Sequence, residues 1–320
     1  MKTKLQAEIV KIVTKSITLF ALIILADYLI SNGIDYILRK NQSGYYEFKQ
    51  VVETKPEIVI LGASRASCHY VSTKVAKGTG RSVYNFGVGG TSVLVQYTQL
   101  QEILSVYKPK LIVYEICGSD FSQYFVMDSS IRYLKMFPLT VETKRAFKET
   151  DKYFVYKNIF KLYKYNNDVL GLIVGRSKTN VYNLGYAPNP TAYLPLILQT
   201  NKSYVSDTQS ASNSALLQQT FCKLLQLTEQ LKIPIVFLRS PYYHPKDSNI
   251  NLRVDPIVLK GIEKHNKSLI DFSSMSIPAF ENPGNYKDYI HLTDKGANMY
   301  TDIIVPYLNK FIDQQIIDDK

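Results

Sequence analysis

Asp288 and His291 lie three residues apart in the segment DYIHLTDKGANMY, residues 288–300. If both residues share one turn, the carboxylate can accept a hydrogen bond from one ring nitrogen while the other nitrogen faces a nucleophile. Ser64 can supply that nucleophile, because it follows the apolar run EIVILG and precedes a helical pattern. Each piece also has an ordinary explanation, since Ser64 can be a helix N-cap and Thr293 the start of a surface helix. The order Ser, Asp, His nevertheless predicts a catalytic triad.

Five apolar runs have the length and composition of buried strands, and helical patterns separate them. The runs lie at residues 57–62, 82–87, 110–118, 233–240 and 268–273, and the helical patterns at 66–76, 93–107, 213–232, 254–266 and 293–312. This alternation predicts an α/β fold with three α/β/α layers around a flavodoxin-like, doubly wound parallel sheet of about five strands. In such sheets ligands bind beyond the carboxyl ends of the strands, where we expect the serine and the histidine to meet.

Residues 121–212 form a long insertion between the third and fourth predicted strands. Residues 121–137 and 153–174 have helical patterns dense in Tyr, Phe and Lys, and the stretch NLGYAPNPTAYLP, residues 183–195, follows them. Loops of this length are commonly binding elements or lids, although a merely structural helical insertion explains the pattern equally well. The aromatic and basic side chains suit sugar rings, acidic groups or a membrane surface.

Three glycines, Gly87, Gly89 and Gly90, follow the second predicted strand. Without a Cβ atom they let backbone N–H groups approach a substrate oxygen, and a tight turn explains them equally well. They do not form the G-x-G-x-x-G pattern of a dinucleotide site, so that class is disfavoured. Ser119 and Asp120, at the end of the third predicted strand, are expected to face the same crevice.

The blocks GASR, NFGVGG, the glycine and polar pair after the third strand, and DYIHLTDKGANMY together resemble the SGNH/GDSL hydrolase superfamily. The resemblance spans residues 56–312. It implies that Ser64 is the nucleophile, that His291 is the general base and that Asp288 orients the histidine. No metal or other cofactor is implied.

The same resemblance implies an oxyanion hole made by the backbone N–H groups of Ser64 and Gly90 and by the side chain at Ser119. The sequence departs from the family pattern at two positions, since Ala63 replaces the usual aspartate and Ser119 replaces the usual asparagine. The loss of one oxyanion donor can lower a rate by about 10² to 10³.

Four further residues are candidates for contact with substrate. Arg65 can pair with an anionic group or equally hold a neighbouring loop, and Arg239, Tyr242 and His244 lie on the loop after the fourth predicted strand. We expect His69 to be an ordinary packing or surface residue of its helix.

The segment from Ser16 to Leu38 is apolar enough and long enough to cross a bilayer as a helix, which takes about 20 residues. Asp27 and Asp35 interrupt it, and a carboxylate at mid-membrane costs about 2.5 to 3.5 kcal/mol. An uncleaved anchor, a cleaved signal peptide and an amphipathic surface helix are the alternatives. The anchor is favoured because no small-x-small cleavage site follows. We therefore expect an anchor at residues 1–40, with its N-terminus in the cytoplasm, and an extracytoplasmic SGNH-like domain at residues 41–320.

The composition narrows the possible partners. The formal charge is +11, from 38 Lys and Arg against 27 Asp and Glu. The basic residues are spread along the chain and no nucleic-acid recognition motif accompanies them, so nucleic acid is disfavoured as a partner. The three cysteines form no C-x-x-C pair, which disfavours a zinc site or a disulfide framework.

The resemblance implies a membrane-anchored serine esterase or O-acyltransferase. Such a protein acts through an acyl-enzyme on an extracytoplasmic acylated carbohydrate or cell-envelope polymer, with a membrane-bound acyl donor as a further partner. The alternative is a non-catalytic SGNH-like protein that binds or assembles components of a polysaccharide modification or export system. Ala63 and Ser119 favour the alternative, and the presence of all three triad residues favours the enzyme.

Overall fold

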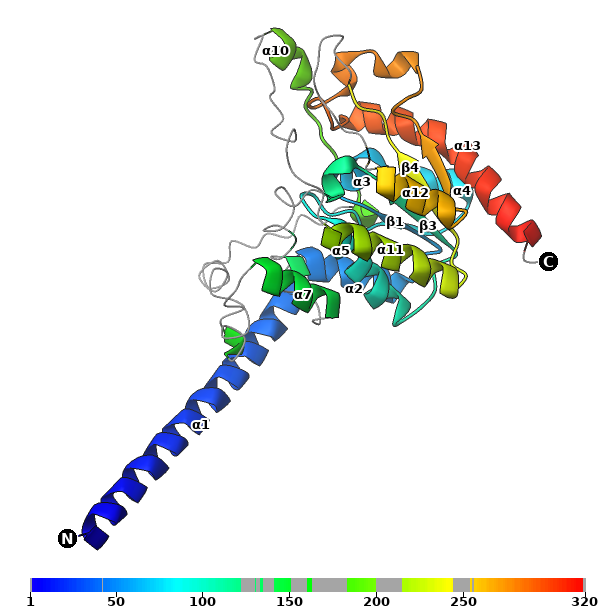
Figure 1. Cartoon of the computed structure of the whole chain (residues 1–320). Helices are drawn as coiled ribbons and strands as arrows, with labels where there is room; N and C mark the ends of the chain where they lie inside the picture. Colours follow the sequence, from blue (N-terminus) through cyan, green and yellow to red (C-terminus); the bar gives the residue numbers. More distant parts are fainter. Residues whose placement is uncertain are drawn as a thin grey trace. The chain divides into compact units, whose positions relative to one another are not determined.

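A computed structural model describes residues 2–41, 43–121, 130, 133–134, 141–150, 160–162, 183–199, 215–243, 254 and 256–318 (Figure 1). The chain divides into two compact units. One comprises Met1–Tyr46 with Lys144–Asn180, and the other comprises Glu47–Thr143 with Val181–Lys320. The second unit contains the sheet and every residue of the predicted triad.

The sheet has five parallel strands in the order β2-β1-β3-β4-β5. The strands are β1 (Ile58–Leu61), β2 (Val83–Asn85), β3 (Leu111–Glu115), β4 (Ile235–Arg239) and β5 (Ser268–Asp271). Every residue of β1, β2 and β3 is buried, which explains why their sequences are nearly continuous apolar runs. The predicted five-stranded, doubly wound parallel sheet is therefore confirmed.

Helices cover both faces of this sheet (Figure 1). On one face, α13 (Asp294–Asp318) packs against α3 (Ser64–His69) and α4 (Ser72–Thr79). On the other face, α11 (Ala215–Gln230) packs against α5 (Val93–Leu104) and α12 (Pro256–Lys264). The strands thus lie between two helical layers, as the alternating pattern predicts.

The predicted helix over residues 66–76 is interrupted between α3 and α4. Tyr70 has extended backbone angles, φ −114° and ψ 105°, and its side chain is completely buried. The extended backbone ends α3 and turns the Tyr70 ring into the core, so the two short helices replace the single one that the periodicity predicts.

The described end of the insertion contains a 3₁₀ turn, η3 (Asn183–Gly185), and a short helix, α10 (Leu194–Gln199). Gly185 has φ +80°, and a Cβ atom there would lie 1.8 Å from the carbonyl oxygen of Asn85. Only glycine allows this close approach, which fixes the returning chain beside the end of β2. The helices predicted at 121–137 and 153–174 lie mostly outside the described residues.

The remaining helices precede the sheet or lie in the insertion. They are α1 (Lys2–Asn41), α2 (Ser43–Thr54) and α7 (Val141–Thr150). Residues 4–34 of α1 are long and apolar enough to cross a membrane, and large apolar side chains from Leu5 to Leu25 are 43–64% exposed. A single long apolar N-terminal helix is consistent with an anchor or a signal sequence.

Candidate active site

Ser64 lies where β1 passes into α3, at the carboxyl edge of the sheet. The turn is possible because Gly62 has φ +141°, and a Cβ atom there would lie 2.7 Å from the carbonyl oxygen of Glu115 on the neighbouring strand. Ser64 is the first residue of the helix and is partly exposed. Its hydroxyl is therefore held at the edge of a rigid sheet and remains open to solvent.

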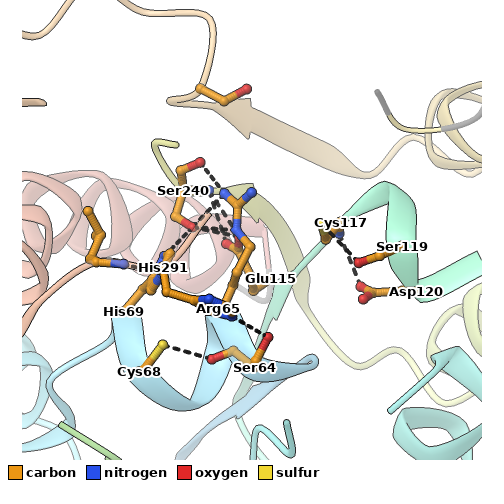
Figure 2. Close-up of polar contacts among 12 residues, drawn as sticks. Ser64, Arg65, Cys68, His69, Glu115, Cys117, Ser119, Asp120, Ser240 and His291 are labelled. Carbon is orange, nitrogen blue, oxygen red and sulfur yellow. Dashed lines mark hydrogen bonds and ion pairs between the residues drawn. The ribbon is translucent and has the colours of Figure 1, made fainter. Parts of the chain in front are cut away.

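Ser64, His291 and Asp288 lie in hydrogen-bond contact. The Nε2 atom of His291 is 2.8 Å from Oγ of Ser64, and its Nδ1 atom is 2.9 Å from Oδ2 and 3.0 Å from Oδ1 of Asp288. The structure thus brings Ser64 to Asp288 and His291, which lie more than 220 residues later in the sequence, so that the three residues predicted as a triad are in contact. Figure 2 shows His291 and Ser64 among the polar groups at this edge.

The electrostatics of Asp288 favour its ionised form. Burial opposes ionisation, but the hydrogen bonds from the His291 ring and from the backbone N–H groups of Ile290 and His291 outweigh it and lower the pKa of Asp288. An ionised Asp288 can only accept, so the His291 proton is on Nδ1 and the lone pair of Nε2 faces the Ser64 hydroxyl. This is the tautomer that a general base requires.

Comparison of the sequence with protein families finds one decisive match. The family described as "Protein of unknown function (DUF1574)" matches residues 16–215, which is more than half of the chain. The chain belongs to the DUF1574 family. The matched segment includes Ser64 but neither Asp288 nor His291, and no curated protein matches the sequence.

The fold of this DUF1574 protein resembles that of SGNH/GDSL esterases at low sequence identity. A putative lipolytic protein of the G-D-S-L family from Desulfitobacterium hafniense DCB-2 has a TM-score of 0.38 and 11% identity, over 78% of this chain and 97% of that one. A two-domain esterase active on acetylated mannans has a TM-score of 0.38 and 13% identity, over 85% and 55%. BT4096, a gut microbial diltiazem-metabolizing enzyme, has a TM-score of 0.39 and 13% identity, over 78% and 46%. The chain spans about half the length of the last two proteins.

The loop that carries the histidine in this DUF1574 protein is held by Asn189, at the end of the insertion. Its side chain donates to the carbonyl oxygen of Leu292 at 3.2 Å and accepts from Nζ of Lys287 at 3.2 Å. The backbone carbonyl oxygen of Asn189 accepts the backbone N–H of Asp294 at 2.8 Å. Asn189 is not among the site residues predicted from the sequence. It lies in the Asn/Pro/Tyr-rich stretch of the insertion, which was the feature of the sequence that could have indicated a functional residue there.

The backbone beside the nucleophile comes from the glycine-rich turn after β2. A Cβ atom on Gly89 would lie 3.7 Å from Cβ of Ser64, so the Gly89 backbone passes next to the serine. Gly90, the predicted oxyanion donor, has φ +71°, the left-handed conformation that glycine adopts readily. Gly89 thus packs beside Ser64, and the oxyanion contact predicted for the Gly90 N–H stays a prediction.

The Ser119 hydroxyl, predicted as an oxyanion donor, lies just beyond β3 in the 3₁₀ turn η1 (Gly118–Phe121). Ser119 Oγ donates to Sγ of Cys117 at 3.3 Å (Figure 2). Asp120 is almost completely buried, and burial raises its pKa to about 8. Asp120 therefore carries a proton for much of the neutral pH range, and its Oδ2 accepts the N–H of Cys117 at 3.1 Å.

Of the four residues predicted to contact substrate, Arg239 and Tyr242 lie at and after the end of β4. Arg239 Nη1 pairs with Oδ2 of Asp271 at 3.0 Å, and the guanidinium carbon of Arg239 lies 5.6 Å from the ring centroid of Tyr242. Tyr242 is partly exposed, so its ring can contact a ligand. His244 lies outside the described residues.

Arg65 requires a correction. It is 2% exposed, and its Nε is 2.9 Å from Oε1 of Glu115 in a buried ion pair. A guanidinium enclosed in this way cannot reach a substrate, because its charge is needed to compensate the buried carboxylate. Its role is structural rather than the predicted substrate contact.

We expect Arg65→Met to lower the free energy of unfolding by about 3–5 kcal/mol, because the Glu115 carboxylate would remain buried without its cation. The matched control is Arg81→Met. Arg81 pairs with Glu57 at the same 2.9 Å, but the two side chains are 29% and 28% exposed, so a loss of at most about 1 kcal/mol is expected. Chemical denaturation of both variants measures the difference, and equal losses would contradict it.

The other reactive groups of this region do not form a second centre. Within the described residues, no group of three or more His, Cys, Asp or Glu side chains is arranged to hold a metal ion. Cys68 is buried, and burial raises the pKa of its thiol to about 12. The thiol is therefore protonated at neutral pH and does not compete with Ser64 as a nucleophile.

Proposed function

We propose that this protein is an SGNH-type serine esterase or O-acyltransferase that works through an acyl-enzyme. The observation that supports this most strongly is the 2.8 Å contact between Ser64 Oγ and His291 Nε2, with His291 Nδ1 bonded to Asp288. A serine that is merely a helix cap needs neither a neutral imidazole at its hydroxyl nor a carboxylate behind that imidazole.

In the proposed reaction, His291 takes the Ser64 proton while Oγ attacks the acyl carbonyl carbon. The carbonyl oxygen becomes an oxyanion beside the start of α3, where the N–H of Ser64 and the Gly89 backbone lie. His291 then gives the proton to the departing alcohol oxygen, which leaves an acyl ester on Ser64. Water or a sugar hydroxyl, deprotonated by the same histidine, releases the acyl group.

The proposed substrate is an O-acylated carbohydrate or cell-envelope polymer outside the cytoplasm. Tyr242 and Arg239 support this class, because an aromatic face can stack on a sugar ring and a guanidinium can bond its hydroxyls. A membrane-bound donor of acyl groups is a further proposed partner if the acceptor is a sugar hydroxyl.

The experiment that tests this function measures acetate release from acetylated xylo- or manno-oligosaccharides by the full-length chain in detergent. Release by the wild-type chain that disappears in Ser64→Ala and persists in Ser105→Ala supports the esterase. Ser105 is a suitable control because its exposed hydroxyl donates to the Glu102 carbonyl oxygen of the preceding helix, α5.

A second candidate is a non-catalytic binding or assembly protein. It is favoured by one observation, which is that the Ser119 hydroxyl donates its proton to Cys117 Sγ at 3.3 Å instead of being free for an oxyanion. Binding of an acetylated oligosaccharide without acetate release, by a folded wild-type chain, would favour this candidate over the enzyme.

We also propose that α1 is retained as a membrane anchor. Asp27 supports this proposal, since its carboxylate accepts the backbone N–H groups of Lys161 at 2.7 Å and Leu162 at 2.9 Å and is only 7% exposed. Nζ of Lys161 also lies 4.5 Å from the ring centroid of Tyr28. Cleavage of α1 would leave these insertion groups without their partners, so we expect retention.

The mature chain in the membrane fraction is therefore expected to begin before Asp27 and to resist extraction at alkaline pH. Intact-mass measurement and N-terminal peptide sequencing check this expectation. A mature chain that begins after residue 27, or one that is released as a soluble protein, would refute the retained anchor.

A further inference from the structure

A buried carboxylate, Glu115, lies at the carboxyl end of β3 and is 1% exposed. Its Oε1 forms an ion pair with Nε of Arg65 at 2.9 Å and accepts a hydrogen bond from the hydroxyl of Ser240 at 2.6 Å. Nη2 of Arg65 donates to the same Ser240 hydroxyl oxygen at 2.7 Å. The backbone N–H of Ser240 points at both carboxylate oxygens, at 3.2 and 3.1 Å, and the Tyr70 hydroxyl donates to Oε2. Arg65 of α3 and Ser240, which follows β4, therefore both contact this buried carboxylate, as Figure 2 shows.

His69 extends this set of hydrogen bonds. Its Nδ1 is 2.7 Å from the hydroxyl oxygen of Ser240, and its Nε2 is 3.0 Å from the backbone nitrogen of Leu292. A backbone N–H can only donate, so Nε2 accepts and the ring proton is on Nδ1, from which it is donated to Ser240. We call Arg65, His69, Tyr70, Glu115 and Ser240 the Glu115 cluster.

The donor and the acceptor are fixed for each hydrogen bond in the series that runs from Leu292 to Glu115. The N–H of Leu292 donates to His69, His69 donates to Ser240, and Ser240 donates to Glu115. This series of hydrogen bonds requires a neutral His69 imidazole, because a protonated ring would have no lone pair to accept the Leu292 N–H. Burial, together with the charge of Arg65, holds the pKa of His69 well below its usual value, which agrees with the geometry.

The Glu115 cluster and Leu292, which donates to it through His69, adjoin the two reacting residues. Arg65 follows Ser64 in the chain, and Leu292 follows His291. The His69 ring also lies edge-on to the His291 ring, with 6.3 Å between the ring centroids. The backbone on both sides of the Ser64–His291 contact is thus tied to one buried carboxylate.

We propose that His69 is a positioning residue, which holds the Leu292 backbone on the Glu115 cluster so that His291 Nε2 stays within reach of Ser64 Oγ. This inference rests on the proposed function, because it concerns the same proton transfer. His69 does not touch the reacting atoms itself.

The test compares His69→Phe with His69→Gln in the full-length chain in detergent, with 4-nitrophenyl acetate as the substrate. Phenylalanine fills the space but cannot accept from Leu292, whereas the glutamine amide oxygen can. We expect His69→Phe to lower kcat by about 10- to 100-fold with KM within about twofold of wild type, since a misplacement on the order of 1 Å costs about 100-fold. We expect His69→Gln to recover most of the rate.

Two further variants separate positioning from folding. His265→Phe replaces a histidine whose Nδ1 lies 2.7 Å from the Glu229 carboxylate and is not bonded to the Glu115 cluster, so its kcat should equal that of wild type. Ser240→Ala removes the hydroxyl between His69 and Glu115 but keeps the backbone N–H bonds, so it should fold and still lose part of kcat. Thermal unfolding shows which variants are folded.

A spectroscopic reading distinguishes failure of this inference from failure of the proposed function. The downfield proton resonance of the His291 Nδ1–H bonded to Asp288, identified by its loss in His291→Ala, should change in His69→Phe and stay in His69→Gln. If the wild type were inactive but the resonance changed in His69→Phe and stayed in His69→Gln, the proposed enzymatic function would be refuted and the positioning role of His69 would stand. Unchanged kcat and an unchanged resonance in folded His69→Phe would overturn the positioning role itself.

Discussion

His291→Ala is expected to lower kcat for ester hydrolysis by about 10⁴- to 10⁶-fold, because Ser64 then has no base to take its proton. In the structure, the His291 Nε2 atom is 2.8 Å from the Ser64 hydroxyl oxygen, and no other imidazole within the described residues bonds to it. KM should change little, since the imidazole acts in proton transfer rather than in substrate binding.

The control for this variant is His265→Ala, because His265 is also bonded to a carboxylate but has no contact with the triad. Steady-state kinetics with an activated acetate ester give both values. A loss in His291→Ala of less than about tenfold, or an equal loss in the two variants, would contradict the assignment of His291 as the base.

Asp288→Asn is expected to lower kcat by about 10⁴-fold, since it inverts the tautomer of His291. Oδ1 of Asp288 accepts the backbone N–H groups of Ile290 and His291, both at 2.9 Å. An asparagine oxygen would keep those two bonds and place its NH₂ group in the Oδ2 position, facing His291 Nδ1. The ring must then carry its proton on Nε2, where it cannot accept from Ser64.

The matched control is Asp294→Asn, three residues beyond His291. Asp294 accepts a hydrogen bond from the Tyr186 hydroxyl at 2.7 Å and does not contact the histidine ring. Its kcat should stay within a few fold of wild type. If the two asparagine variants lost the same fraction of kcat, a special role for Asp288 would be refuted.

The sheet and the triad were predictable from sequence for the same physical reason. Strands buried on both faces are nearly continuous apolar runs, and the residues that follow such strands meet at one edge of a parallel sheet. The Ser64 turn and the Asp288–His291 spacing are both local features, so they are visible without knowledge of the tertiary structure. The fold prediction is confirmed, and the catalytic roles are proposals that the geometry supports.

The Glu115 cluster could not be derived in this way. Arg65 and Ser240 are 175 residues apart, and neither has a local pattern that names its partner. One signal was present, because Glu115 interrupts an otherwise apolar strand and a buried carboxylate needs a cation or several donors. That requirement decides the direction in which the Arg65 side chain points. Of the two roles that the sequence allowed for Arg65, the structure therefore favours the one that holds a neighbouring loop, through Ser240.

Two further features could not be read from the sequence. The glycine turn after β2 offers Gly89 and Gly90 in succession, and only the folded chain shows that Gly89 packs beside Ser64. Asn189, at the end of the insertion, bonds to Lys287 of the histidine loop, although the two residues are 98 positions apart in the sequence. Composition suggested a binding element there, but only the folded chain shows that it supports the loop.

The most direct test of the central claim is labelling of the full-length chain in detergent by a fluorophosphonate probe, which reacts with activated serines. We expect an adduct on the Ser64 peptide of the wild type and of Ser105→Ala, and no adduct in Ser64→Ala or His291→Ala. An unlabelled, folded wild-type chain, or labelling that persists in Ser64→Ala, would contradict the assignment of Ser64 as an activated nucleophile.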